Sequence, residues 1–494
     1  MLRTGNEHLE SLRDGRVIYV GSERVDDVTR HPAFRNAAHT VAALYDMKAD
    51  PAHRETMTYE EDGGRHSLYF LRARSRDDLQ RRMNCHRMIA DFTYGMFGRS
   101  PDHVASFVTG MAMKLDELKP PFGHPDNLLK YYKYARDADL YTVYAVLPPQ
   151  AARNPEFYQR QNIPVPTLRV VREDDDGVVI SGMKMLATGA VFANEVWIGN
   201  VLPLAPDQKK EAITCAIPCN APGLQFWSRK PMEQDCSSEF DAPLAFRYDE
   251  SDSMLLCDEV KVPWERVFIH DDALLSRNIY FLTPSHCFGN HQSNVRYWSK
   301  MRLMVGLCAK IAHATGADQV PAVKETLGRI SAQEAMIAGM VNGQINAYET
   351  WPGGPEGYVA FNRRMMYAAL EWCTQNNSRF VDDLRELCGG GVFQMPANIS
   401  VMNDPELARQ FQTYWQTPQT DAITRMKLFK LAWDMVGSEF AGRHQQYEKF
   451  YAGASFIVRN HSYRETDWDG FGKIVDDLIS GYGHPAAGKD KSAA

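Results

Sequence analysis

The spacing of hydrophobic residues changes twice along this chain. Residues 1–150 are mostly helical in pattern, with charged faces such as the stretch 76–84. From about residue 165 to 270 the apolar positions form short, β-branched runs, which are typical of strands. After about residue 271 the helical period returns, over 301–311 and 323–337. A long final helix is expected over 421–433, and residues 486–494 are expected to fray.

The central zone predicts a series of short strands. Asp176-Gly177 lies between two β-branched runs and predicts a hairpin. The expected strands are 167–171, 178–180, 195–198, 212–217, 244–248 and 254–257, with 263–269 closing the zone.

The order of these zones indicates an α+β fold in three domains. We expect an N-terminal helical domain over 1–150, a middle β domain over 151–270 and a helical C-terminal domain over 271–494 with a flexible tail. Strands do not alternate with helices as in βαβ units, so a Rossmann sheet is not expected. A chain of 494 residues is long enough for two or three cores.

Composition narrows the class of protein. The 44% hydrophobic and 24% charged residues are typical of globular chains, and a net charge of −7 gives no basic surface for nucleic acid. No apolar run has the length of a membrane span, and the first residues do not resemble a signal peptide. Nine cysteines, an odd number spread along the chain, predict reduced thiols. These features predict a cytoplasmic protein.

The run from Gly95 to His103 contains the leading candidate residue. A Gly-Arg pair followed by Ser-Pro-Asp predicts a turn between two helices, from which Arg99 could project a permanent charge into a cavity. Four residues later the chain places an imidazole, His103. Taken alone, Arg99 could equally cap a helix end or pair with Asp102.

Five strings along the chain resemble one known family. They are residues 21–38, 98–102, 181–188, 262–267 and 437–444, with the sequences GSERVDDVTRHPAFRNAA, GRSPD, SGMKMLAT, VPWERV and GSEFAGRH. The family is that of the 4-hydroxyphenylacetate 3-monooxygenase oxygenase components. Because the strings occur in order over nearly the whole chain, the chain is identified as a member.

The resemblance implies a fold and a chemistry. The fold is acyl-CoA dehydrogenase-like, with an N-terminal helical domain, a middle β-barrel or sandwich domain and a C-terminal four-helix bundle, assembled as a homotetramer. The cofactor is FAD, which reaches the enzyme as FADH2 from a separate NAD(P)H:flavin reductase. With O2 as co-substrate it forms a C4a-hydroperoxyflavin that hydroxylates a phenol, ortho to its hydroxyl group. FAD rather than FMN is favoured by the resemblance alone.

The same resemblance assigns catalytic residues. Arg99 falls on the family's active-site arginine, which would hold flavin and substrate oxygens. The 4-hydroxyphenylacetate type has a tyrosine at the position of His103 and a histidine at that of Tyr144, so the two groups have changed places. The alternatives are a surface histidine and a tyrosine that fills the core.

His291 lies in a stretch similar to one in the chlorophenol and nitrophenol branch of the family, where a histidine is the phenol base. The resemblance therefore implies His291 as general base. The alternative is a histidine at a helix start, satisfied by a backbone carbonyl. The spacing of His286 and His291 is poor for two metal ligands on one helix, so no metal site is expected.

Two segments are expected to contact the flavin. Ala187, Thr188 and Gly189 match the family's flavin-contacting turn. The loop 389–396 resembles the one that reaches the flavin, either within the chain or across a subunit interface. Its candidate contacts are Gly390, Gly391, Gln394 and Pro396. A triple glycine between helices could otherwise be only a flexible turn.

Two other flavoenzyme classes share this fold. An iron–sulfur dehydratase such as 4-hydroxybutyryl-CoA dehydratase needs three cysteines and a histidine, but no cysteine lies within 95–103 and Trp298 stands where one is required. An acyl-CoA dehydrogenase acting on a CoA thioester stays the alternative, and the family strings favour the phenol monooxygenase.

Overall fold

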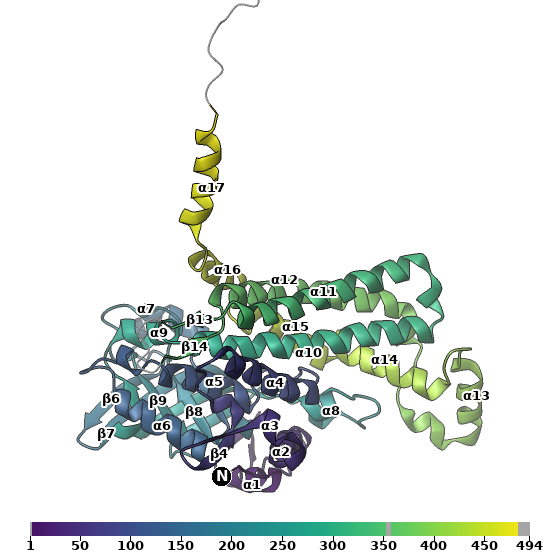
Figure 1. Cartoon of the computed structure of the whole chain (residues 1–494). Coiled ribbons are helices and arrows are strands. Elements are labelled where there is room, and N and C mark those ends of the chain that lie inside the picture. Colours follow the sequence, from purple (N-terminus) through teal and green to yellow (C-terminus); the bar gives the residue numbers. More distant parts are fainter. Residues whose placement is uncertain (1, 352–356, 483–494) are drawn as a thin grey trace, which may run out of the picture.

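The computed structural model describes residues 2–351 and 357–482 (Figure 1). The expected frayed tail, 486–494, lies outside these residues. The N-terminal part contains six helices, and two of them, α4 and α5, flank the Arg99 turn. The helices are α1 (Gly5–Ser11), α2 (Arg35–Ala49), α3 (Arg54–Met57), α4 (Arg76–Phe92), α5 (Pro101–Ala112) and α6 (Pro125–Asp137).

Two sheets form the β domain. The first has the order β2-β1-β10-β11-β7-β6 and the second β12-β9-β8-β5, and β7 contacts β5 while β11 contacts β9. The strands are β1 (Val17–Val20), β2 (Glu23–Val25), β5 (Thr142–Ala145), β6 (Arg169–Asp174), β7 (Gly177–Thr188), β8 (Glu195–Ile198), β9 (Thr214–Pro218), β10 (Leu224–Ser228), β11 (Asp252–Pro263) and β12 (Val267–Ile269). Small two-stranded sheets are formed by β3 (Thr58–Glu61) with β4 (Gly64–Ser67), and by β13 (Glu349–Thr350) with β14 (Val359–Ala360).

The predicted hairpin is confirmed, because β6 and β7 pair with Asp174 opposite Gly177. Three strands from the first 150 residues also join these sheets. β1 pairs in parallel with β10, and β5 pairs in parallel with β8. Their partners lie far along the chain, so a local pattern does not reveal them. The division of the chain at residues 150 and 270 stays a proposal.

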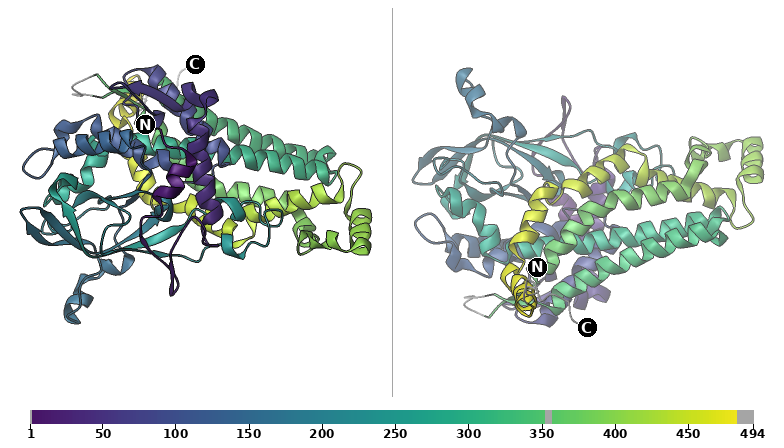
Figure 2. Two further views of the ribbon diagram at one scale, coloured as in Figure 1. Left: turned by 90° about the horizontal axis from the view of Figure 1, so that it is seen from below. Right: turned by 90° about the horizontal axis from the view of Figure 1, so that it is seen from above.

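The C-terminal part is a bundle of long helices that lie side by side in both views of Figure 2. The helix α10 packs against α11, α12 and α14, and α12 packs against α14 and α15. Beyond the bundle, α17 extends away from the rest of the protein (Figure 1). The helices are α9 (Ala273–Leu282), α10 (Ser285–Ala314), α11 (Pro321–Asn346), α12 (Arg363–Cys388), α13 (Pro405–Trp415), α14 (Ala422–Val436), α15 (Glu439–Phe450), α16 (Ser455–Arg464) and α17 (Trp468–Ser480).

The prediction of a strand over 244–248 is wrong. This segment is a short helix, α8 (Ala245–Tyr248). The backbone N–H groups of Leu244 and Ala245 both donate to Oδ2 of Asp434 on α14, at 2.9 and 3.1 Å. A carboxylate that accepts the free donors of a first turn stabilises a helix there, whatever the strand propensity of the segment.

The helix over 421–433 is present as α14, but it is not the last helix of the chain. The helix α14 ends at Val436, with Gly437 as its C-cap residue. Ser438 then caps α15 by accepting a hydrogen bond from the backbone N–H of Ala441 at 3.1 Å. A serine at the N-cap position starts a new helix by satisfying one of its unpaired donors.

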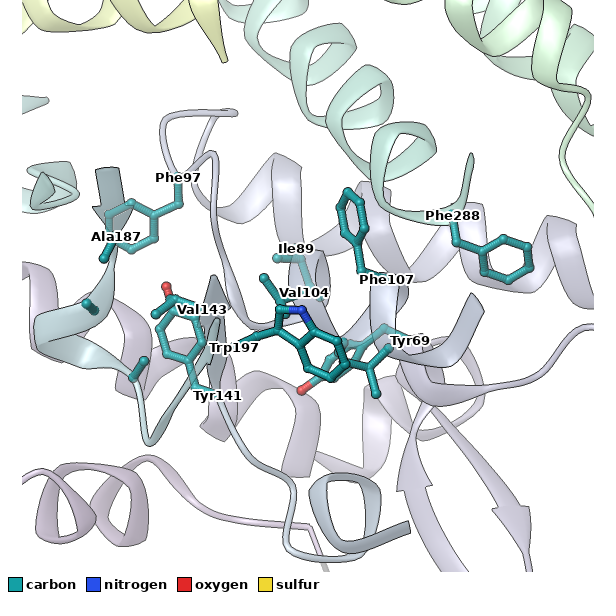
Figure 3. Packing of buried hydrophobic residues seen from close by; sticks show 14 of the residues in the cluster. Tyr69, Ile89, Phe97, Val104, Phe107, Tyr141, Val143, Ala187, Trp197 and Phe288 are labelled. Carbon is teal, nitrogen blue, oxygen red and sulfur yellow. The ribbon is translucent and has the colours of Figure 1, made fainter. Parts of the chain in front are cut away.

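One large hydrophobic core connects the three parts of the chain (Figure 3). Tyr69 and Val104 come from the N-terminal helical part, Val143 and Trp197 from the sheet and Phe288 from α10, and all are buried. Because this core crosses the domain borders, the helices on either side of the β domain are held in fixed positions relative to it.

Replacing Asp434 with alanine should lower the free energy of unfolding by about 1–3 kcal/mol, because two buried N–H groups of α8 lose their acceptor. The matched variant Asp434→Asn keeps an acceptor oxygen and should lose less. Denaturant titration followed by circular dichroism measures both. Equal stability of the alanine variant and the native protein would contradict this account of α8.

Candidate active site

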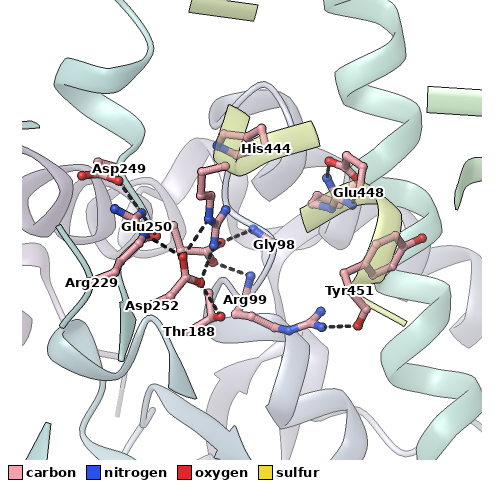
Figure 4. A network of polar contacts seen from close by, with 12 residues as sticks. Gly98, Arg99, Thr188, Arg229, Asp249, Glu250, Asp252, His444, Glu448 and Tyr451 are labelled. Carbon is pink, nitrogen blue, oxygen red and sulfur yellow. Dashed lines mark hydrogen bonds and ion pairs between the residues drawn. The ribbon is translucent and has the colours of Figure 1, made fainter. Parts of the chain in front are cut away.

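The turn between α4 and α5 is fixed by a buried carboxylate, Glu250 (Figure 4). Glu250 accepts hydrogen bonds from the backbone N–H groups of Gly98, at 3.0 Å, and Arg99, at 2.5 Å. A side chain at position 98 would collide with Tyr447, whose hydroxyl would lie 1.9 Å from an added Cβ. The turn therefore depends on both the carboxylate and the glycine.

Glu250 belongs to a network that connects the β domain to α15. Arg443 donates to Glu250 at 3.3 Å and to Asp252 at 2.7 Å, and Arg229 also donates to Asp252, at 2.8 Å. Burial raises the pKa of Glu250, against the effect of Arg443. Burial also opposes ionisation of Asp252, but the two arginines outweigh it and hold its pKa well below the usual range. Asp252 is therefore a carboxylate at neutral pH.

The guanidinium of Arg99 is buried, and one of its nitrogens is free. Nη2 donates to the backbone carbonyl of Tyr451 at 2.8 Å, whereas Nη1 has no hydrogen-bond partner among the described residues. The guanidinium carbon lies 5.2 Å from the ring centre of Tyr144 and 5.5 Å from that of Tyr447. Burial opposes the charge of Arg99, but Tyr144, Tyr447 and Glu250 raise its pKa. Of the two alternatives for Arg99, pairing with Asp102 does not occur, but Nη2 does cap a helix end, because Tyr451 is the C-cap residue of α15.

The structure brings His103 and Tyr144 together with Arg99. The ring of His103 lies 5.5 Å from that of Tyr144, and Phe107 packs edge-on against both, at 5.1 and 5.7 Å. His103 is 1% exposed, so it is not the surface residue of the alternative interpretation. Burial, and then Arg99, hold its pKa well below the usual value. At neutral pH this imidazole carries no charge.

His291 lies in a different set of contacts. Its ring stacks on Phe361 at 3.5 Å and meets His86 at 6.2 Å. Its Nδ1 is 2.7 Å from Oε1 of Gln344, so it is anchored by a side chain and not by a backbone carbonyl. Burial, and then His86, lower its pKa well below the usual value. The role implied for His291 stays a prediction.

The expected flavin turn lies at the junction of β7 and β11, next to the network of Figure 4. The Thr188 hydroxyl donates to Asp252 at 2.7 Å, and Ala187 pairs with Ser253. Gly189 has φ of +78°, and a Cβ there would lie 2.6 Å from the hydroxyl of Tyr141. The same Tyr141 hydroxyl donates to the backbone carbonyl of Arg99, so this turn and the Arg99 turn are in contact.

The loop 389–396 is not near these residues within one chain. It forms a 3₁₀ helix, Gly389–Phe393, that packs on α14 beside α13, at the end of the bundle away from the β domain (Figure 1). The aromatic ring of Phe429 would lie 2.4 Å from a Cβ on Gly391, while Phe393 is 79% exposed. The Gln394 carbonyl accepts a hydrogen bond from Trp415 at 2.6 Å.

The sequence gave no role to the residues that hold Arg99 in place. Arg443 is part of the string 437–444, and Glu250 and Asp252 lie in the acidic run 249–252, which ends at the first residue of β11. Such a run usually forms a solvated loop, but here Asp249 and Glu250 are buried and Asp252 is half-buried. The signal that marks these carboxylates as part of the site is their contact with buried arginines, which can be seen only in the folded structure.

A second buried ion cluster supports the same region from the bundle. Glu448 accepts from Arg296 at 2.6 and 2.7 Å and from Lys300 at 2.9 Å. Arg296 also donates to the carbonyl of Gly95, at the start of the Arg99 turn, at 3.1 Å. Burial opposes ionisation of Glu448, but Arg296 and Lys300 outweigh it and lower its pKa to about 2.

Metal and membrane features are absent from the part of the chain that the structure describes. No group of three His, Cys, Asp or Glu side chains there is placed to hold a metal ion, and no helix there is long and apolar enough to cross a membrane. All nine cysteines are free, and eight of them are buried.

The arrangement of a helical part, a β domain and a helical bundle is the acyl-CoA dehydrogenase-like fold. A solved structure titled as the oxygenase component of 4-hydroxyphenylacetate 3-monooxygenase complexed with FAD and 4-hydroxyphenylacetate matches with a TM-score of 0.90 and 31% identity, covering 97% of this chain and 98% of the other. An archaeal 4-hydroxybutyryl-CoA dehydratase from N. maritimus, at 20% identity and a TM-score of 0.86, shares the fold.

Sequence comparison gives the family. Residues 4–269 match "4-hydroxyphenylacetate 3-hydroxylase N terminal" and residues 276–480 match "4-hydroxyphenylacetate 3-hydroxylase C terminal". The chain belongs to this family, as the five strings predicted. The 4-hydroxyphenylacetate 3-monooxygenase oxygenase component of Thermus thermophilus is 35% identical, over 92% of both chains. The 4-nitrophenol 2-monooxygenase oxygenase component of a Rhodococcus species is 32% identical, over 92% of this chain and 87% of that one.

The residues of the site suit a flavin ring. Nη1 of Arg99 and Nη1 of Arg443 are buried nitrogens without partners in the described part of the chain, and so is the hydroxyl of Tyr447. A buried donor without an acceptor is costly. The carbonyl oxygens and ring nitrogens of a flavin would supply acceptors to such donors.

Replacing Glu448 with glutamine should change how stability depends on pH. Its folded-state pKa of about 2 is below the usual 4.5, so the carboxylate stabilises the fold above about pH 4.5, and this contribution is lost as the pH falls toward 2. Glu448→Gln should remove that part of the acid transition. It should also lower the free energy of unfolding at pH 7 by about 3–5 kcal/mol, because Arg296 and Lys300 stay buried without a counter-ion.

Denaturant titrations at several pH values measure this effect. The matched control is Glu439→Gln, which breaks the exposed pair with Lys230 and should change stability by less than about 0.5 kcal/mol. An unchanged acid transition in Glu448→Gln would show that the cluster does not stabilise the fold.

Proposed function

We propose that this chain is the oxygenase component of a two-component monooxygenase that uses reduced FAD and O2 to hydroxylate a phenol. The observation that carries the proposal is the buried guanidinium of Arg99, which lies over the ring of Tyr144 and keeps one nitrogen free, while His103 packs against the same tyrosine. A fixed cation in a buried site stabilises a phenolate. The family membership, which covers nearly the whole chain, supports the same reaction.

The residues of the site would perform three tasks. Reduced FAD together with O2 supplies the electrophilic oxygen. Arg99 stabilises the negative charge that develops on the phenol oxygen, which is almost fully protonated at neutral pH because its usual pKa is about 10. Phe107 and Tyr144 enclose the phenol ring and exclude water. A neutral imidazole, His103 or His291, accepts the phenol proton.

The new hydroxyl group is placed ortho to the existing one. Two relatives support this regiochemistry by name, since a 4-hydroxyphenylacetate 3-monooxygenase and a 4-nitrophenol 2-monooxygenase both act on the carbon next to the one that bears the hydroxyl. An oxygenase component also needs a partner, so a separate NAD(P)H:flavin reductase supplies the reduced FAD.

The working assembly is a homotetramer in which a neighbouring copy completes the flavin site. The loop 389–396 supports this assembly, because it lies away from Arg99 within one chain and exposes Phe393. Gly390, Gly391, Gln394 and Pro396 would then contact the flavin of the adjoining subunit, while Thr188 and Gly189 contact it within their own.

Anaerobic mixing with reduced FAD and then O2, in a stopped-flow spectrometer, tests the function. The native protein should give a long-lived absorbance distinct from both reduced and oxidised flavin, and phenols should alter its decay. Arg99→Met should reoxidise FAD as free flavin does and lower hydroxylation by about 10²-fold or more. Arg172→Met, on the exposed face of β6, is the matched control.

If the native protein reoxidises flavin at the rate of free flavin, with and without phenols, the monooxygenase function is wrong and CoA thioesters become the substrates to examine.

The double variant Phe393→Ser, Gln394→Ala should weaken the binding of reduced FAD by about tenfold, because an aromatic contact and a hydrogen bond are lost. Anaerobic fluorescence titration measures the affinity. Phe456→Ser, at an exposed phenylalanine on α16, is the control and should bind as the native protein does. Unchanged affinity in the double variant would place the flavin away from this loop.

A further inference from the structure

Four buried histidines share an unusual feature, and three of them could accept a proton. His444 is the exception: its Nδ1 lies 3.3 Å from Nζ of Lys300, which can only donate, so the proton of this ring is on Nε2, which has no partner in the part of the chain that the structure describes. His86, His103 and His291 each hold a partner through Nδ1, namely Asp102 at 2.7 Å, Gln292 at 2.9 Å and Gln344 at 2.7 Å. In each ring Nε2 is buried and has no hydrogen-bond partner in the described residues. Each could therefore offer Nε2 to a ligand, and their surroundings decide which one does.

Of the three histidines that could accept a proton, only His103 lies beside Tyr144 and Arg99. Its ring contacts are Tyr144 and Phe107, and among charged groups Arg99 has the largest effect on its pKa. His291 instead has one ring face covered by Phe361, at 3.5 Å and nearly parallel (8°). His86 is hydrogen-bonded to Asp102 and packs against His291. A phenol held by Arg99 would therefore meet His103 first.

The orientation of the Gln292 amide is fixed by its neighbours. Nε2 of Gln292 lies 3.3 Å from Oδ1 of Asp102 and 3.3 Å from the hydroxyl oxygen of Ser100. Ser100 donates its own proton to Asp102 at 2.5 Å, so both oxygens can accept from the amide N–H groups. The reverse orientation would place the amide oxygen against a carboxylate, which has no hydrogen to donate.

This orientation determines where His103 carries its proton. The amide oxygen of Gln292 faces Nδ1 of His103 at 2.9 Å, and an amide oxygen can only accept. Nδ1 must therefore be protonated, and a neutral imidazole then has its lone pair on Nε2. The chain Asp102–Gln292–His103 thus presents an unprotonated nitrogen to the site.

We propose that Nε2 of His103 accepts the phenol proton and that Gln292 is the positioning residue that keeps it unprotonated. This inference rests on the proposed function and deepens it. In the step, the phenol O–H bond breaks, an N–H bond forms on Nε2, and the electron pair stays on the phenol oxygen beside Arg99. The resemblance places His103 where the family has a tyrosine, so the proposal concerns a feature of this chain.

The charges around His103 suit a base that stays neutral. Burial disfavours a second proton on the ring, and so do Arg99, Arg296 and His86, whereas Gln292 favours it. Asp102 and Tyr144 complete the surroundings. Such an imidazole is a weak base, but a weak base is sufficient. Arg99 stabilises the phenolate as it forms, which lowers the pKa of the bound phenol and lets a weak base accept its proton.

The test compares two phenols in single-turnover reactions with reduced FAD and O2. 4-Hydroxyphenylacetate is protonated at neutral pH and needs a base, whereas 4-nitrophenol is already largely ionised in weakly alkaline buffer. Gln292→Met keeps the side-chain length and removes the amide. It should slow hydroxylation of 4-hydroxyphenylacetate by about 10²-fold or more and leave that of 4-nitrophenol near the native rate. The remaining rate should rise with pH as the phenol itself ionises.

A double-mutant cycle shows whether Gln292 acts through His103. His103→Phe keeps the ring contacts and should show the same selective loss, and adding Gln292→Met to it should cause no further loss. Gln344→Met removes the matching contact of His291. It should lower the rate of hydroxylation of both phenols by the same factor. If Gln344→Met shows the selective loss and Gln292→Met does not, His291 is the base and the proposal is wrong.

A binding measurement is independent of turnover. The native protein should bind 4-hydroxyphenylacetate about 2- to 12-fold more tightly than 4-methoxyphenylacetate, which cannot donate a hydrogen bond, and Gln292→Met should lose this preference. Equilibrium dialysis measures both affinities. Equal slowing of both phenols, or an unchanged preference in Gln292→Met, would overturn the role of Gln292. A native protein that reoxidises reduced FAD at the rate of free flavin, with and without phenols, would instead contradict the proposed function.

Discussion

A single buried carboxylate holds the turn from which Arg99 projects. Glu250 accepts the N–H groups of both Gly98 and Arg99, and its charge is balanced by Arg443 of α15. The turn belongs to the N-terminal helical part, Glu250 precedes β11, and Arg443 is on the bundle. All three parts of the fold therefore meet at this point. The position of the Arg99 guanidinium depends on how these three parts pack against one another.

The rest of the site follows from that constraint. With its backbone fixed, Arg99 can use Nη2 for the carbonyl of Tyr451 and keep Nη1 for a ligand. The helix α5 starts directly after the turn, so His103 lies one turn of helix further on and faces Tyr144 and Phe107. Gln292 reaches His103 from α10, the long helix that also anchors the turn through Arg296. A cation and a neutral imidazole are thus held next to each other without a hydrogen bond between them.

The sequence predicts those features that depend on neighbouring residues. The hairpin at Asp176-Gly177, the turn before Pro101 and the long helices of the C-terminal part all have local signals, and the strings of the family locate Arg99. The helix at 245–248 could not be predicted, because its first N–H groups are satisfied by Asp434, which is 190 residues away. Glu250 and Gln292 were missed for the same reason, since their partners in the site lie 152 and 189 residues away.

The central claim, that Glu250 holds the Arg99 turn, can be tested by hydrogen exchange measured by mass spectrometry over residues 95–103. The backbone N–H groups of Gly98 and Arg99 are bound to Glu250, so the native segment should exchange slowly. In Glu250→Ala this segment should exchange much faster, while α10 and α12 keep their native protection. Unchanged protection of residues 95–103 in the variant would contradict the account, because the turn would then be held by something other than this carboxylate.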